Sequence, residues 1–226
     1  MRGMGSLYLV RHGQASFGAA DYDQLSATGH AQCCHLGAYW QARGQRFDAV
    51  FIGTLRRHAQ SLAALVEGYG ADLPATALPG LNEYDSEAVV RAIHPGPLAP
   101  PRDAETVKQH FRLLRQGLLA WLAGETAPAG MPTHAAFAAG VADALDRVRA
   151  VGVGRQVLIV SSGGPIATAV AQVLACPPES FVELNLRIRN SAVTEFAFNP
   201  KRHHLVTFNA LPHLESPGLR HLFSFC

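Results

Sequence analysis

An arginine and a histidine stand side by side at the end of a short apolar run. Arg11 and His12 directly follow LYLV at 7–10, and a second arginine, Arg57, lies in the polar segment GTLRRHAQS at 53–61. A guanidinium is permanently charged, and its planar fork matches two oxygens of a phosphate group. A neutral imidazole can attack phosphorus and form a phosphohistidine, while nearby guanidiniums stabilise the charge on the transferred group. These residues predict phosphoryl chemistry at His12, with no metal ion needed.

Two further segments supply groups that such a reaction uses. SSGGP at 161–165 opens a predicted helix, so the Ser162 hydroxyl and the Gly163 N–H can bind phosphate oxygens at a helix start that favours anions. Glu83, in LNEYD at 81–85, lies on a predicted loop and can protonate a leaving oxygen. Asp85 and Glu87 are alternatives for this acid, since carboxylates are common in loops.

Apolar runs alternate with helical patterns along the chain. Strands are predicted at 7–10 and 48–53, briefly within 76–85, before the glycine turn of 155–176, and at 190–199 and 204–211. Helices are predicted at 25–44, capped by Ser26 or Thr28, and at 54–70, 104–124, 133–152 and the end of 155–176. This alternation predicts a three-layer α/β/α sandwich with a mostly parallel central sheet. Ligands bind beyond the carboxyl ends of such strands, where the phosphate-type residues converge.

Composition excludes several other classes of protein. The 226 residues, 48% of them hydrophobic, suffice for one large α/β domain or a domain with an insertion. A net charge of +2 without basic runs argues against nucleic-acid binding. Cys33, Cys34, Cys176 and Cys226 form no CxxC pair, which predicts reduced thiols in a cytoplasmic protein. No stretch has the pattern of a secretory signal or a membrane helix.

The ordered segments together resemble the histidine phosphatase superfamily, whose fold is that of phosphoglycerate mutase. VRHGQ resembles the motif whose histidine is phosphorylated, and LNEYD resembles the segment that supplies the acid. In GTLRRHAQS, the Arg-x-x-Gln spacing selects Arg57 over Arg56 as the second phosphate-binding arginine. The remaining matches are LSATGHAQ at 25–32, AET at 104–106 and VLIVSSGGPI at 157–166. They cover nearly the whole chain in the expected order.

The resemblance implies one phosphoglycerate-mutase-like domain over 1–226, with a helical cap insertion at about 86–132 that selects a small phosphorylated substrate. It also implies a phosphoric monoester hydrolase that works through a phosphohistidine without a cofactor. The implied catalytic residues are His12 and Glu83. The implied phosphate-binding residues are Arg11, Arg57, Ser162 and Gly163.

Two positions depart from the family pattern. Ser162 stands where the family usually has a second pocket histidine, and Gly18 stands where many members have an asparagine. Loss of one charged donor slows comparable reactions by ~10²–10³-fold, which predicts reduced or altered activity. If only the charge is missing, Ser162→His raises activity; no gain means a pocket rebuilt around serine. His58, expected to point elsewhere on its helix but able to reach the pocket rim, and His213, expected to support a loop, are the candidates to compensate.

Alternatives to the phosphatase reading stay open at this point. A protein of the same fold that binds a phosphate ligand without turnover is the first, and a mutase is the second. Lys108, Arg112 and Arg115 recur at helical spacing and either contact an anionic substrate or form a charged surface stripe. The last strand, at an edge of the sheet, is a site where a second chain can pair to form a homodimer.

Overall fold

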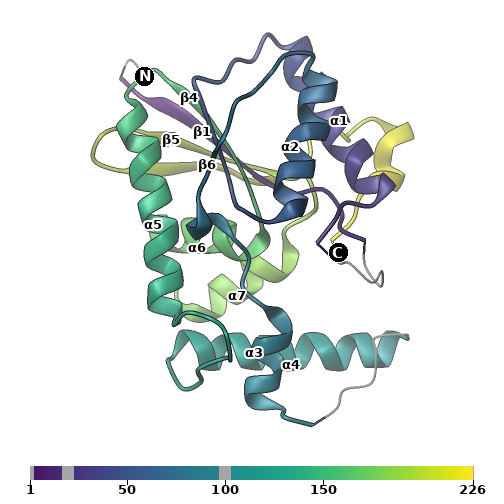
Figure 1. The fold of residues 1–226 in the computed structure, drawn as a ribbon, viewed down its shortest axis with the longest axis vertical. Coiled ribbons are helices and arrows are strands. Elements are labelled where there is room, and N and C mark those ends of the chain that lie inside the picture. The colour runs from purple at the N-terminus through teal and green to yellow at the C-terminus, as the bar shows by residue number, and fades with distance from the viewer. Residues whose placement is uncertain (1–2, 17–22, 97–102, 226) are drawn as a thin grey trace.

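The computed structural model describes residues 3–16, 23–96 and 103–225 (Figure 1). Within these residues, six strands form one sheet in the order β3-β2-β4-β1-β5-β6. They are β1 (Gly5–Arg11), β2 (Ala49–Ile52), β3 (Thr76–Ala77), β4 (Gln156–Ser161), β5 (Val193–Phe198) and β6 (His203–Ala210). β1, β2, β3 and β4 pair in parallel, while β5 runs antiparallel to both β1 and β6. The predicted mostly parallel sheet is confirmed.

Alternate residues of the strands pack on the two faces of the sheet. Leu7 and Leu9 of β1 and Ile159 of β4 belong to a core shared with α5 (His134–Val151) and α6 (Gly163–Leu174). Val10 and Val160 point to the opposite core, shared with α1 (Ala27–Ala42) and α2 (Arg56–Tyr69). This period-two alternation places helices on both faces of the sheet, as the three-layer prediction requires.

Three further helices extend the structure beyond the sheet layers. α3 (Ser86–Ile93) and α4 (Ala104–Leu122) lie together at one end of the molecule (Figure 1), where Gly117 of α4 meets Val89 of α3. α7 (Pro178–Arg187) follows α6. The sequence predicted α4 but neither α3 nor α7, both of which are short. The substrate-selecting cap at 86–132 stays a prediction.

Local sequence explains where the helices that border the sheet edge begin and end. Ser26 is the N-cap of α1, and its hydroxyl accepts a hydrogen bond from Gly29 N at 3.1 Å, which decides between the two predicted caps. α2 ends at Gly70 with a φ of 74°.

Among the helices that the structure describes, none combines the length and apolar character needed to cross a bilayer.

Among the strands that the structure describes, β6 lies at one edge of the sheet and pairs with β5. The sequence predicted that the last strand lies at an edge of the sheet, where a second chain can pair with it. The homodimer itself stays a prediction.

Candidate active site

The carboxyl ends of β1, β2 and β4 meet at one edge of the sheet. Arg11 is the register partner of Ser161, and the backbone N–H of His12 donates to Ser161 O at 2.8 Å. The N–H of Gly53, directly after β2, donates to Val160 O at 3.2 Å. The segments that follow these strands are therefore held side by side by the ladder of the sheet.

His12 lies buried at this edge in a form suited to nucleophilic attack. Its side chain is 2% exposed, and Nδ1 donates to Gly13 O at 2.7 Å, which leaves the lone pair on Nε2. Burial lowers the pKa of His12 well below its usual value, and the charges of Arg11 and Arg57 lower it further. The imidazole is therefore neutral at physiological pH.

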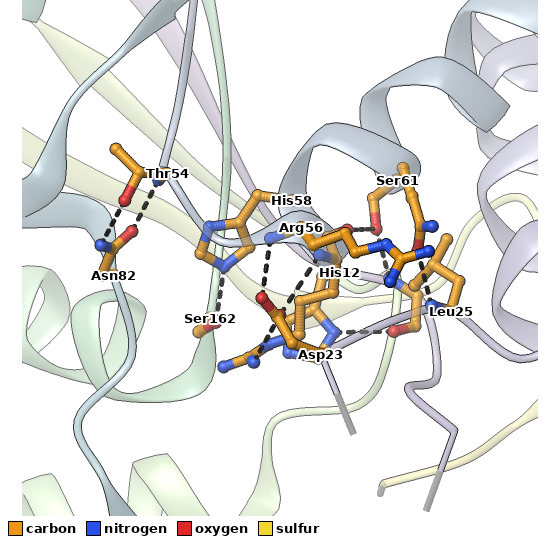
Figure 2. A network of polar contacts seen from close by, with 12 residues as sticks. His12, Asp23, Leu25, Thr54, Arg56, His58, Ser61, Asn82 and Ser162 are labelled. Atoms are coloured by element: carbon orange, nitrogen blue, oxygen red, sulfur yellow. Dashed lines mark hydrogen bonds and ion pairs between the residues drawn. The ribbon is translucent and has the colours of Figure 1, made fainter. Parts of the chain in front are cut away.

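Arg57 is buried and ion-paired with Asp23. Its NH1 lies 2.9 Å from Asp23 Oδ1, and the same carboxylate accepts the N–H groups of Arg56 at 2.9 Å and Arg57 at 3.3 Å (Figure 2). Asp23 thus caps the start of α2 from a distant segment. The neighbouring Arg56 side chain is exposed.

The Arg11 side chain is bonded to backbone carbonyls in the C-terminal part of the chain. Its guanidinium donates to the carbonyl of Phe225 at 2.8 Å and to the carbonyl of Ile188. The charges of Arg11 and Arg57 lower the pKa of Glu83 as well as that of His12. Both guanidiniums therefore lie within electrostatic range of His12 and of Glu83.

Glu83 reaches the start of α6 from the loop after β3. Its Oε1 accepts a hydrogen bond from Gly164 N at 2.9 Å. Burial raises the pKa of Glu83 above its ordinary value, against the opposing effects of both arginines and the backbone N–H groups. A raised pKa keeps a larger fraction of the carboxyl group protonated, as a general acid requires.

The two alternative acids are engaged elsewhere. Asp85 is the N-cap of α3 and accepts from Ala88 N at 3.0 Å. Glu87 pairs with Arg91 one turn further along α3, at 3.4 Å. The geometry therefore favours Glu83 among the three carboxylates.

Ser162 lies at the same edge with an unexpected neighbour. Its hydroxyl is 2.7 Å from Nε2 of His58, and the His58 ring centroid lies 5.8 Å from that of His12. His58 is fully buried beside Ser162, whereas the sequence predicted a side chain that points elsewhere on its helix. His213 instead bonds the Ser191 hydroxyl at 2.9 Å, which is the loop-supporting role the sequence favoured. Gly18 lies outside the described residues.

Further positioning residues were not singled out from the sequence. Asn82 joins the loop of Glu83 to the loop after β2 through two 2.6 Å hydrogen bonds with Thr54 (Figure 2). Ser61 on α2 accepts the Gly13 N–H at 3.0 Å. Together with Asp23, these contacts join positions 28 or more apart in the chain, so no local pattern announces them.

Gly13 is required because the backbone after His12 meets the start of α1. A Cβ at position 13 would lie 2.3 Å from Gly29 O. Gly13→Ala is expected to displace His12 and to lower the free energy of unfolding by about 1–3 kcal/mol through overpacking. Urea unfolding measures this loss of stability. Gly218→Ala, where a Cβ meets nothing within 4 Å, is the control. A Gly13→Ala protein as stable as the wild type would contradict this packing argument.

The basic residues predicted on α4 line a groove beside α7. Lys108, Arg112 and Arg115 share an open groove of about 450 Å³ with Arg187, and both Arg115 and Arg187 pair with Glu183. The groove is consistent both with contact to an anionic substrate and with a charged surface stripe. Its role therefore stays a prediction.

Outside the site, and within the described residues, three side chains of the types that can bind a metal ion lie close together. His30 Nε2 is 3.1 Å from Glu67 Oε2, and its Nδ1 is 3.5 Å from Cys34 Sγ. The exposed imidazole thereby bridges α1 to α2.

Comparison with known proteins identifies the family of the chain. The model of the histidine phosphatase superfamily (branch 1) matches residues 7–211. No curated protein matches the chain significantly.

Several solved structures share the fold at low sequence identity. A phosphoglycerate mutase from Bacillus anthracis is 17% identical with a TM-score of 0.65, over 94% of this chain and 96% of that chain. A phosphoserine phosphatase variant from Entamoeba histolytica, in complex with phosphoserine, is 18% identical with a TM-score of 0.62, over 93% and 99%. A mycobacterial glucosyl-3-phosphoglycerate phosphatase is 22% identical with a TM-score of 0.64, over 92% and 99%.

The family model spans His12, Arg57, Glu83 and Ser162, and the TM-scores show that the chain shares the fold of these structures. By sequence and by fold, this chain belongs to the histidine phosphatase superfamily, branch 1.

Proposed function

We propose that this protein hydrolyses phosphate monoesters through a phosphohistidine formed at His12. The observation that carries the proposal is a buried imidazole whose Nδ1 donates to Gly13 O, which leaves Nε2 as the nucleophile, within electrostatic range of two guanidiniums. The direction of each pKa shift favours the proposed role, since a lowered pKa favours the neutral imidazole of His12 and a raised pKa favours the protonated form of Glu83.

The reaction proceeds in two displacements. Nε2 of His12 attacks phosphorus, the bond from phosphorus to the ester oxygen breaks, and Glu83 gives its proton to the departing alcohol. Arg11 and Arg57 stabilise the transferred group, with Ser162 and the Gly163 N–H at its other oxygens. Glu83 then takes a proton from water, which attacks the phosphohistidine and releases phosphate.

The substrate class is a small phosphate monoester. Two solved structures of this fold carry the names of phosphatases for phosphoserine and glucosyl-3-phosphoglycerate, which supports a phosphatase of small metabolites. Ser162 in place of the second pocket histidine favours reduced or altered turnover. The same substitution motivates the second candidate, a protein that binds phosphate ligands without turnover.

Trapping of the phosphoenzyme tests the proposal. Wild-type protein mixed with a radiolabelled phosphate monoester and quenched in alkali is expected to retain an acid-labile label, and to release phosphate when left unquenched. His12→Ala is expected to lose both. His203→Leu, which replaces a buried histidine at the opposite end of the sheet, where His203 pairs with Phe198, is the matched control.

The outcomes separate the candidate functions. Absence of label and of hydrolysis across a broad panel of phosphate esters would end the phosphatase proposal. Tight binding of esters in calorimetry without turnover would favour the silent binder. Interconversion of 2- and 3-phosphoglycerate in a coupled assay would identify a mutase.

A further inference from the structure

We propose that His58 and Ser162 act as one phosphate-binding unit, in which His58 Nε2–H donates to Ser162 Oγ and the Ser162 hydroxyl donates to a phosphoryl oxygen. The unit supplies the donor that a second pocket histidine would otherwise provide. This inference rests on the proposed function, since it takes the anion at His12 to be a phosphoryl group.

The hydroxyl of Ser162 is not used to cap its own helix. Ser162 is the N-cap of α6, yet it forms no side-chain capping bond. A capping hydroxyl accepts from the N–H of the second or third helical residue. Here the N–H of Gly164 is bonded to Glu83, and Pro165 has no N–H. The sequence GGP therefore leaves the Ser162 hydroxyl to His58.

His58 is fixed in a position that faces Ser162. Its ring is fully buried in the first turn of α2, and Nδ1 lies so close to Gly53 that a Cβ there would be 2.2 Å from it. Only glycine at position 53 leaves room for this imidazole. Nε2 then points at Ser162, as Figure 2 shows, 2.7 Å from its hydroxyl.

The direction of the hydrogen bond decides what the unit can bind. A serine hydroxyl has one proton and two lone pairs. The neutral His58 ring carries one proton; with that proton on Nε2, the ring donates to Oγ and the hydroxyl proton is free for an anion oxygen. A chain of donors polarises along its length, so the serine becomes a stronger donor than it is alone. His12, 5.8 Å from His58 between ring centroids, places the anion beside this proton.

The arrangement also bears on the Ser162→His substitution. A histidine at position 162 would need the space that the buried His58 ring already occupies. We therefore expect Ser162→His alone to bring no gain, and Ser162→His combined with His58→Ala to regain phosphate affinity. In this chain the imidazole that contacts position 162 comes from the start of α2.

Titration with inorganic phosphate tests the coupling independently of turnover. His58→Leu and Ser162→Ala are each expected to weaken phosphate binding by about 10- to 100-fold, the range for one lost hydrogen bond to a charged group. The double variant is expected to bind no more weakly than either single variant, because each change breaks the same chain of donors. His58→Gln, which keeps a donor at similar reach, is expected to recover part of the affinity.

Packing effects are separated by stability and by a control. His203→Leu removes a buried histidine at the opposite end of the sheet and is expected to lose stability without losing phosphate affinity. The same variants are compared for kcat and KM, where the lost donor lowers kcat as well as raising KM.

Each result decides the inference. Additive losses in the double variant, or phosphate affinity unchanged in His58→Leu, would overturn it while leaving the proposed function intact if turnover persists. Coupled losses in a protein without turnover would uphold the unit and reject the phosphatase. Wild-type protein that neither binds phosphate nor turns over an ester would remove both.

Discussion

Glu83→Gln is expected to lower kcat/KM for alkyl phosphates, which reports formation of the phosphohistidine, by about 10²–10⁴-fold, the usual contribution of a general acid, while sparing kcat/KM for p-nitrophenyl phosphate. An alkoxide is a poor leaving group and needs the proton of Glu83, whereas p-nitrophenolate leaves without one. The amide cannot deliver a proton, but it can still accept the Gly164 N–H that Glu83 accepts at 2.9 Å. Steady-state kinetics of the wild type and the variant on a series of esters measures how the loss depends on the leaving group.

The directions of the two pKa shifts predict how the activity changes with pH. His12 must be neutral, and its pKa is lowered, so activity persists into mild acid. Glu83 must be protonated, and its pKa is raised, so activity falls as the pH rises through that pKa. Glu83→Gln is expected to remove this alkaline limb, and Asp85→Asn on α3 is the control. An equal loss of kcat/KM on all esters would rule out proton donation by Glu83 to the leaving group.

Stability is expected to fall steeply as the pH drops below about 6. Burial lowers the pKa of His58 and of His213 to about 3 and that of His203 to about 4. The unfolded chain protonates these side chains near pH 6.5, while the folded protein does not. Each contributes a loss of about 1.4 kcal/mol per pH unit in this window. Three together cost roughly 4 kcal/mol per unit, against a typical total of about 5–15 kcal/mol.

Urea unfolding between pH 4.5 and 7.5 measures this dependence. His213→Asn is expected to reduce the slope by about one proton, or roughly 1.4 kcal/mol per pH unit, because it removes one buried titrating group. His221→Asn, at an exposed position, is the control. A free energy of unfolding that is flat down to pH 5 would show that these imidazoles are protonated in the folded state.

The sequence was sufficient for the sheet and for the strand ends. Runs such as LYLV and VLIV are buried on both faces, and parallel order follows from alternation with helices. Because parallel strands end at one edge, Arg11, His12 and Ser162 could be placed together before any coordinates existed.

Contacts between distant segments and short helices escaped prediction. Asp23 meets Arg57 across 34 positions, and α7 is only 10 residues long, too short for a clear helical period. His58 was expected to point away from Arg57 because neighbours on a helix diverge. At the first turn of a helix that starts in the site, however, neighbouring side chains both face inward, and Arg57 and His58 are both buried.

Asp23 has a consequence for the fate of the product. The guanidinium of Arg57 already holds a carboxylate at 2.9 Å, so a phosphoryl group must displace Asp23 or share the arginine with it. Its affinity is therefore the difference between two ion pairs. If the proposed hydrolysis takes place here, we expect the Asp23 carboxylate to compete with free phosphate for Arg57, and so to speed product release and limit inhibition by inorganic phosphate.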